Sequence, residues 1–195
     1  MFNLPNANRR SERLIGRETS LLLIVDVQAK LLPLIARHAT ISWNIQRLVE
    51  GALAMSVPQV VTEQYPEKLG STIPEVAQKL RPATRKRMFS CRECFDGFDA
   101  FRSTRRRQVV LCGIESHVCV LQTALDLVAA DWSVFAVVDA MGSRTELDHA
   151  IALQRLNAES IVLTTTESVL FEWCETSVAP EFRVVSSLVK QVRPE

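Results

Sequence analysis

The chain has 195 residues, of which 47% are hydrophobic and 23% are charged, and its length fits one globular domain better than two. Its 23 lysines and arginines nearly balance its 22 aspartates and glutamates, so the net charge of +1 gives no reason to expect nucleic acid or a membrane as a partner. Its five cysteines lack the dense spacing of a small secreted scaffold, which favours free thiols in a reducing compartment.

The first 18 residues are interpreted as a flexible lead-in. They contain no uninterrupted apolar segment of the secretory type, and no apolar run in the chain approaches the roughly 20 residues that span a bilayer. We therefore expect a cytoplasmic protein. The arginines of the lead-in faintly resemble a mitochondrial presequence, which is the alternative location, but Glu12 and Glu18 speak against it.

Short apolar runs then alternate with longer helical patterns, which predicts βα units wound into a parallel sheet. Five runs are typical of buried strands: LLLIV (21–25), VPQVV (57–61), VVLCGI (109–114), SVFAVV (133–138) and SIVL (160–163). A sixth strand is expected in ATRKRMFS (83–90), because its charge suits an edge. Apolar spacing predicts helices over 41–55, 118–130, 146–157 and 181–191. The whole chain, 1–195, is predicted to form one three-layer, doubly wound α/β domain with helices on both faces.

Ligands bind outside the carboxyl ends of the strands in such a sheet, so polar residues that follow the apolar runs are candidates for a site. Asp26 emerges from five apolar residues, and its carboxylate needs a compensating partner, although a lone acid here could equally cap a turn. Lys86, taken alone, is typical of solvated edge charge. Cys119 begins a helical pattern; if Ser116 is the N-cap, the free N–H groups of the first turn favour a thiolate. A cysteine at such a place is more often a core residue.

Asp26, Lys86 and Cys119 come from three different strand ends and together form a coherent nucleophilic site. A partly desolvated carboxylate with a pKa raised toward neutrality can take the proton of a thiol, and a lysine can stabilise the charges that develop. Further polar residues at these strand ends are candidates for lining the pocket: Gln28, Glu63, Gln64 and His117.

Several motifs resemble the isochorismatase-like cysteine hydrolases. They are DVQ after the first strand, KRMFS near the third, GIESHVCVLQTALDL after the fourth, and VVDAMGSR after the fifth. The resemblance runs from about Leu21 to Ser168, and VTEQYPEKLGSTIPE narrows it to the branch of the isochorismatase domain-containing proteins. It implies a six-stranded sheet in the order 3-2-1-4-5-6 and a catalytic triad at Asp26, Lys86 and Cys119.

The same resemblance implies a non-proline cis peptide between Ile114 and Glu115 and an oxyanion hole made by backbone N–H groups near Val118 and Cys119. It also implies a homo-oligomer that acts on a small molecule. Nicotinamidases of this superfamily carry an Asp-x-His-x-x-x-His metal site after the second strand, whereas TEQYPEKLG here contains no histidine. We therefore expect no metal and no cofactor.

Because Cys119 is retained, we expect attack on an amide-like carbonyl through an acyl-enzyme, since isochorismatases that cleave a vinyl ether do not need the thiol. One alternative is a catalytically idle protein of the same fold that binds a small molecule, a protein or RNA. Another is a redox-sensing thiol at Cys119.

Three further segments leave alternatives open. Residues 79–107 hold ten basic residues against three acidic ones; a solvated face is favoured over a nucleic-acid surface. Cys91 and Cys94 form a single CxxC, which is a weak signal for zinc or redox chemistry and is interpreted as two ordinary thiols. The apolar segment 169–178 is consistent either with a contact between subunits or with helix packing inside one.

Overall fold

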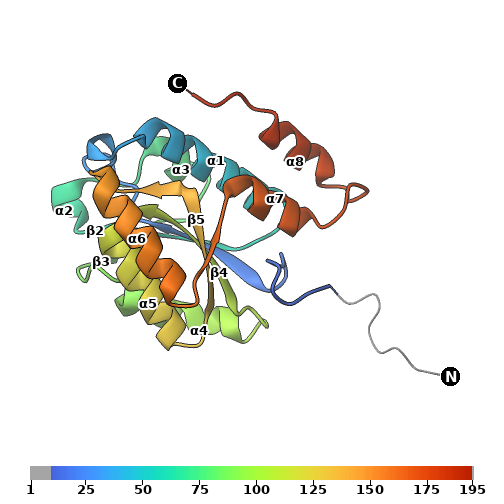
Figure 1. Cartoon of the computed structure of the whole chain (residues 1–195), viewed down its shortest axis with the longest axis horizontal. Coiled ribbons are helices and arrows are strands. Elements are labelled where there is room, and N and C mark those ends of the chain that lie inside the picture. Colours follow the sequence, from blue (N-terminus) through green and yellow to red (C-terminus); the bar gives the residue numbers. More distant parts are fainter. Residues whose placement is uncertain (1–9, 195) are drawn as a thin grey trace.

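The computed structural model describes residues 10–194, and a six-stranded parallel sheet forms its centre (Figure 1). The strands are β1 (Ser20–Val25), β2 (Gln59–Gln64), β3 (Thr84–Lys86), β4 (Gln108–Ile114), β5 (Ser133–Gly142) and β6 (Val162–Thr164). Their order is β3-β2-β1-β4-β5-β6, and every neighbouring pair is parallel. The predicted fold class and strand order are confirmed.

Helices connect the strands and cover both faces of the sheet (Figure 1). They are α1 (His38–Ala54), α2 (Pro66–Leu69), α3 (Pro74–Ala77), α4 (Asp96–Arg102), α5 (Leu121–Ala129), α6 (Glu146–Ala158), α7 (Thr166–Cys174) and α8 (Phe182–Val189). Three short turns add η1 (Leu32–Leu34), η2 (Cys91–Cys94) and the π-helical η3 (Ser116–Val120). The four predicted helices are present, but α5 begins three residues later than predicted because η3 precedes it. No described helix is both long and apolar enough to cross a bilayer.

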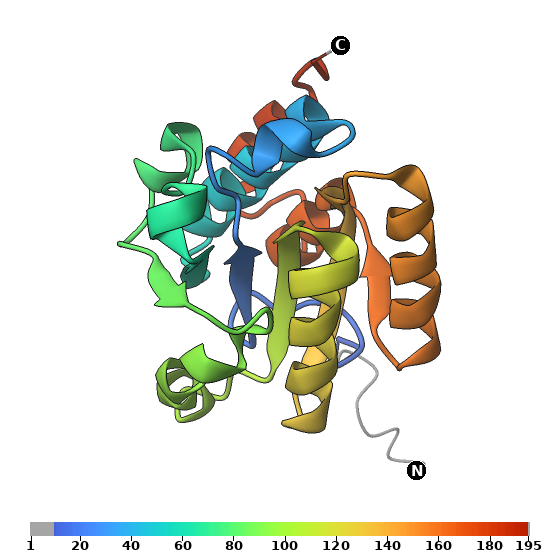
Figure 2. The same cartoon turned by 90° about the vertical axis from the view of Figure 1, so that its left-hand side faces the viewer.

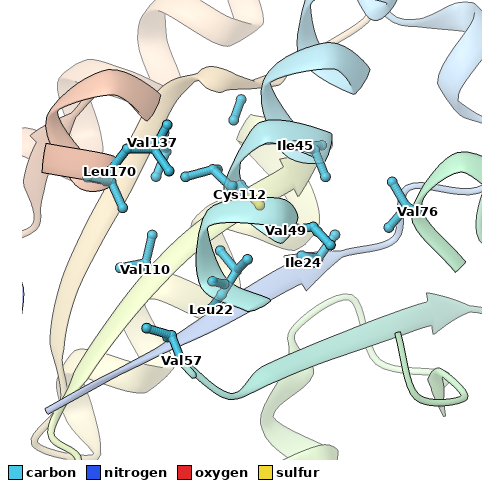
Figure 3. Close-up of a cluster of buried hydrophobic side chains, with 14 of the residues drawn as sticks. Leu22, Ile24, Ile45, Val49, Val57, Val76, Val110, Cys112, Val137 and Leu170 are labelled. Atoms are coloured by element: carbon cyan, nitrogen blue, oxygen red, sulfur yellow. The ribbon is translucent and has the colours of Figure 1, made fainter. Parts of the chain in front are cut away.

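The face of the sheet under α1, α7 and α8 holds the larger part of the core. Leu22 and Ile24 of β1 and Val110 of β4 lie against Ile45 and Val49 of α1 (Figure 3). Alternate residues of a strand point to opposite faces, so Leu23, between Leu22 and Ile24, serves the other face. This explains why the central strands are apolar without interruption.

The other face of the sheet packs against α5 and α6, which lie side by side (Figure 2). Leu21, Leu23 and Val25 of β1 belong to this second cluster of buried residues. Cys91 and Cys119 belong to it as well. The candidate nucleophile is therefore on the α5 side of the sheet.

The predicted charged strand is the edge strand β3, as expected. Its hydrogen-bonded part is only three residues long, and Thr84 and Arg85 are exposed whereas Lys86 is buried. A short and charged edge resists pairing with another chain.

Residues 10–18 do not form the flexible lead-in that the sequence suggested. Ile15 is completely buried beside α7, and its N–H donates to Glu172 Oε2 at 2.6 Å. The Arg10 guanidinium donates to the Glu172 carbonyl at 2.6 Å and pairs with Glu175 at 2.9 Å. That prediction is wrong for these residues because Ile15 anchors them to the core; residues 1–9 lie outside the described part of the chain.

The apolar segment 169–178 is used inside the subunit. Val169, Leu170 and Trp173 of α7 are completely buried in the α1 cluster. The Trp173 indole N–H donates to the Ser20 hydroxyl at 2.8 Å and so ties α7 to the start of β1. Packing within one subunit therefore explains most of the apolar residues of this segment.

Gly113 allows β1 and β4 to approach each other at the end of the sheet that carries Asp26. Its φ is +120°, and an added Cβ would lie 2.1 Å from the Val25 carbonyl oxygen. We expect Gly113→Ala to lower the free energy of unfolding by about 3 kcal/mol or more, because it combines backbone strain with a clash. Urea denaturation measures this. Gly97→Ala is the matched control, since a Cβ there meets nothing within 4 Å, and equal stability of the two variants would contradict the close approach.

Candidate active site

Asp26 is the first residue after β1 and is completely buried. Its φ of +53° is left-handed, which turns the chain out of the strand. It stays attached to β2, because its N–H donates to the Thr62 carbonyl at 3.2 Å and its Oδ1 accepts a hydrogen bond from the Thr62 hydroxyl at 2.9 Å. The carboxylate is therefore held in one place.

Lys86 is the last residue of β3, and its side chain is completely buried against Asp26. The ammonium Nζ lies 2.6 Å from Asp26 Oδ2. It also donates to Gln64 Oε1 at 2.8 Å and to the Phe89 carbonyl at 2.8 Å. A buried ammonium is tolerable only with such partners, so the turn after β3 is folded around this charge.

Cys119 lies in η3, and its thiol is close enough to the Asp26 carboxylate for the two groups to interact. The structure thus brings together the three residues that the sequence placed at separate strand ends. Asp26 is paired with the Lys86 ammonium and also interacts with the Cys119 thiol.

Burial dominates the electrostatics of this group. It raises the pKa of Asp26 above its usual value of 3.8, although Lys86, Cys119 and Thr62 each act to lower it. Burial also raises the pKa of Cys119, and the negative charge of Asp26 adds to this effect. Burial alone would lower the pKa of Lys86, but the charges of Asp26 and Cys119 bring it above its usual value. The resting thiol is therefore neutral and needs a base.

The sequence suggested that Ser116 caps a helix start and that the N–H groups there favour a Cys119 thiolate; the structure does not support this. Glu115, not Ser116, is the N-cap residue of η3, and it makes no side-chain capping bond. The Ser116 hydroxyl is instead hydrogen-bonded to His149 Nδ1 at 3.0 Å. The N–H groups of the turn do not outweigh the burial of the Cys119 thiol.

The loop before Cys119 matches the family resemblance in one respect and departs from it in another. The peptide bond between Ile114 and Glu115 is cis, as the resemblance implies. The Val118 N–H, however, donates to the Glu115 carbonyl at 3.1 Å, so it is already occupied. This leaves the Cys119 N–H as the candidate oxyanion donor from the expected pair.

Gln28 and Gln64 lie close to Asp26 and Lys86. The Gln64 amide accepts from Lys86 through Oε1 and donates to the Arg87 carbonyl at 2.8 Å through Nε2, which fixes its orientation. Gln28 holds the backbone of Gln64, accepting from its N–H at 2.8 Å and donating to its carbonyl at 3.0 Å. Together they position the ammonium of Lys86.

Glu63 does not belong to this group, and its predicted place in the pocket is wrong. Its Oε1 accepts hydrogen bonds from the N–H and the hydroxyl of Thr72, at 2.7 and 2.9 Å. Thr62 and Gln64, its neighbours in β2, contact Asp26 and Lys86. Because side chains alternate along a strand, Glu63 faces the other side of the sheet.

His117 is half-buried in η3, and its Nδ1 is hydrogen-bonded to the Ser143 hydroxyl at 2.9 Å. It therefore links the loop after β4 to the residues that follow β5. This contact is consistent with a supporting role, and it does not bring the imidazole to the three central residues.

Sequence reasoning missed two supports of the site. Thr62 follows the predicted second strand, which ended at residue 61, and nothing in the sequence marks its bond to Asp26. Arg144 donates from its N–H and its Nε to Glu115 Oε2, both at 3.1 Å, and so fastens the loop before Cys119. The motif VVDAMGSR, which ends at Arg144, was a signal for this contact.

Cys91 and Cys94 are both free thiols, as the sequence suggested. Burial raises the pKa of Cys91 to about 12 and that of Cys94 to about 11. Among the described residues, no group of three or more histidines, cysteines or carboxylates could hold a metal ion.

The basic segment 79–107 is not a uniformly solvated face. Lys86 is buried, Lys79 pairs with Glu50, and Arg106 donates to the Ser20 carbonyl. Several of its charges therefore serve contacts within the fold.

Comparison with known proteins agrees with this geometry. A family model described as the isochorismatase domain matches residues 20–168. The mouse isochorismatase domain-containing protein 2A is 35% identical over 97% of this chain and 91% of its own length. A secreted isochorismatase effector from Phytophthora sojae is 34% identical over 98% and 93%. The solved structure of the MAR1 ribonuclease from Caenorhabditis elegans matches with a TM-score of 0.87 and 34% identity, over 93% of this chain and 95% of that one. The chain therefore belongs to the isochorismatase family.

Proposed function

We propose that this chain is a hydrolase that uses Cys119 to cleave an amide-like C–N bond of a small molecule through an acyl-enzyme. The observation that supports the proposal is the Asp26 carboxylate, which is paired with a buried ammonium and interacts with a buried thiol. A neutral thiol beside a carboxylate of raised pKa is suited to proton transfer during attack.

In the first half of the reaction, the Cys119 sulfur attacks the carbonyl carbon of the substrate while Asp26 takes the thiol proton. A carbon–sulfur bond forms, and the carbonyl electrons move to oxygen, where the Cys119 N–H stabilises the oxyanion. Asp26 then gives its proton to the leaving nitrogen. The C–N bond breaks, the amine departs, and a thioester remains.

In the second half, water attacks the thioester and Asp26 takes one of its protons. The carbon–sulfur bond breaks, the acid is released, and the proton returns to the Cys119 sulfur. Lys86 carries a positive charge through both halves and stabilises the carboxylate form of Asp26 between proton transfers.

The alternatives from the sequence make different predictions. A binding protein on this fold would turn over nothing, and a redox sensor would be oxidised at Cys119 by peroxide without hydrolysing any acyl substrate. The nematode relative named as a ribonuclease adds RNA to the candidate substrates. A homo-oligomer and a cytoplasmic location remain predictions.

A panel of small amides, ureides and carbamates, with one short RNA, tests the proposal against the wild type and Cys119→Ala. We expect at least one carbonyl compound to be hydrolysed by the wild type and not by the variant. Absence of turnover across the panel would favour a binding protein. RNA cleavage that persists in Cys119→Ala would contradict the role of the thiol.

Gln64 is expected to be a positioning residue for Lys86. Gln64→Leu removes the Oε1 acceptor and should lower kcat/KM for the responsive substrate by roughly ten- to a hundredfold, because the ammonium loses its orientation next to Asp26. Steady-state kinetics measures this effect. Glu63→Gln is the matched control, because Glu63 precedes Gln64 in β2 and its side chain faces the other side of the sheet. This variant should keep kcat/KM within about twofold of the wild type. Equal losses in the two variants would contradict the assignment.

A further inference from the structure

A second candidate site lies at the amino ends of the strands, at the opposite end of the sheet from Cys119. A cavity of about 500 Å³ is lined by residues of the segment that leads into β1 and by Gln108 and Ser133. These two residues are the first of β4 and β5 and pair in register. The catalytic group follows the carboxyl ends of the strands, so the two sites are separate.

The wall of this cavity is preformed by Gln108, which is buried and fully hydrogen-bonded. Its Oε1 accepts from the Gly16 N–H at 2.9 Å and from the Thr19 hydroxyl at 2.7 Å. Its Nε2 donates to the Leu14 carbonyl at 2.9 Å. The chain before β1 is thereby fixed against the sheet, and the cavity does not depend on a side chain moving.

Positive charge dominates the lining. Arg10, Arg105 and Arg107 line the cavity, and Glu12 is the one carboxylate among the described residues that do so. Arg10 is paired with Glu175.

The other two guanidinium groups have no carboxylate partner within the described part of the chain. Arg107 donates to the carbonyls of Arg102 and Arg106 at 2.8 and 2.7 Å, which orients the group without neutralising it. Arg105 is exposed and makes no ion pair with a described residue. Two unneutralised cations on one cavity favour an anionic occupant.

We propose that this cavity binds a small organic molecule that carries phosphate groups, such as a nucleoside phosphate. Guanidinium groups match the geometry of phosphate oxygens and stay charged at any physiological pH. The volume is within the range of small-molecule sites and exceeds what a single phosphate fills. Leu14 adds an apolar wall for the organic part of the ligand.

Titration calorimetry of the full chain with ADP tests the proposal, with inorganic pyrophosphate as the second probe. We expect ADP to bind, with a Kd that rises roughly ten- to a hundredfold in Arg105→Gln and in Arg107→Gln, and that rises as salt is added. Arg155→Gln, which changes an exposed arginine of α6, is the matched control and should bind ADP like the wild type. The Arg105 side chain is exposed and makes no hydrogen bond or ion pair with a described residue, so Arg105→Gln keeps the test valid if Arg107→Gln unfolds.

Several outcomes would overturn the proposal. They are the absence of ADP binding, binding that is equal in Arg105→Gln and the wild type, and binding of pyrophosphate without ADP. Binding of an RNA oligonucleotide where ADP fails would assign the surface to a macromolecule instead. Hydrolysis of a panel substrate should be unchanged in Arg105→Gln, so failure here and failure of the hydrolase proposal are distinguishable.

Discussion

Replacing Cys119 with serine is expected to lower kcat/KM for the responsive substrate by about ten thousandfold or more. The hydroxyl of serine is far harder to deprotonate than a thiol. The Asp26 carboxylate is too weak a base to take the proton of a hydroxyl efficiently. The substitution changes one atom of a buried side chain, so the fold should be kept.

Cys94→Ser is the matched control for this experiment, because Cys94 is another buried free thiol and lies in η2, outside η3. It should retain nearly full activity. If Cys119→Ser kept a tenth or more of the wild-type kcat/KM, the hydroxyl would be sufficient and the thiol could not be the nucleophile that the proposal requires.

Replacing Lys86 with methionine is expected to lower the free energy of unfolding by about 3–5 kcal/mol at neutral pH. The methionine fills similar space but leaves the carboxylate of Asp26 buried without its cation. Urea denaturation measures the loss. The double variant Asp26→Asn with Lys86→Met removes both charges and should recover part of the stability, which separates the loss of charge pairing from the loss of packing.

The sign of the pH dependence follows from the raised pKa of Asp26. A carboxyl group whose pKa is higher in the folded state than the unfolded-state value of 3.8 stabilises the folded protein at pH values below 3.8. This stabilisation is lost as the pH rises through the folded-state pKa. Lys86→Met removes the ammonium that lowers this pKa, so the pKa should rise further. The destabilisation by Lys86→Met should therefore be largest at neutral pH and shrink toward acid pH. A loss that is constant with pH would contradict the buried carboxylate as its cause.

Much of the fold could be predicted because buried parallel strands are short apolar runs. LLLIV and VVLCGI, the central strands, were recognisable from composition alone. The pairing of Asp26 with Lys86 could be predicted because both are charged residues at strand ends, where burial demands partners. The strand order came from the family resemblance and not from the spacing of the runs.

The rest depends on three-dimensional detail that the sequence does not display. The predicted second strand ended at residue 61, whereas β2 continues to Gln64. Which of Glu63 and Gln64 faces the side of Asp26 is set by the pairing register of β2, and a shift of one residue would exchange the two faces. Ile15 could not be recognised as an anchor because only Leu14 beside it is apolar, within a stretch flanked by Arg13 and Arg17. The burial of Cys119 outweighs the helix-start effect that its position suggested.

Alkylation of the individual cysteines by iodoacetamide, followed by peptide mass spectrometry near neutral pH, tests the central claim most directly. Cys94 is 9% exposed and has a pKa of about 11, whereas Cys119 is 5% exposed. Exposure alone would therefore make Cys94 the faster thiol. If Asp26 activates Cys119, Cys119 will react fastest of the five cysteines, and Asp26→Asn will slow it without slowing Cys94. A Cys119 that reacts no faster than Cys94, or at a rate that Asp26→Asn leaves unchanged, would contradict the account.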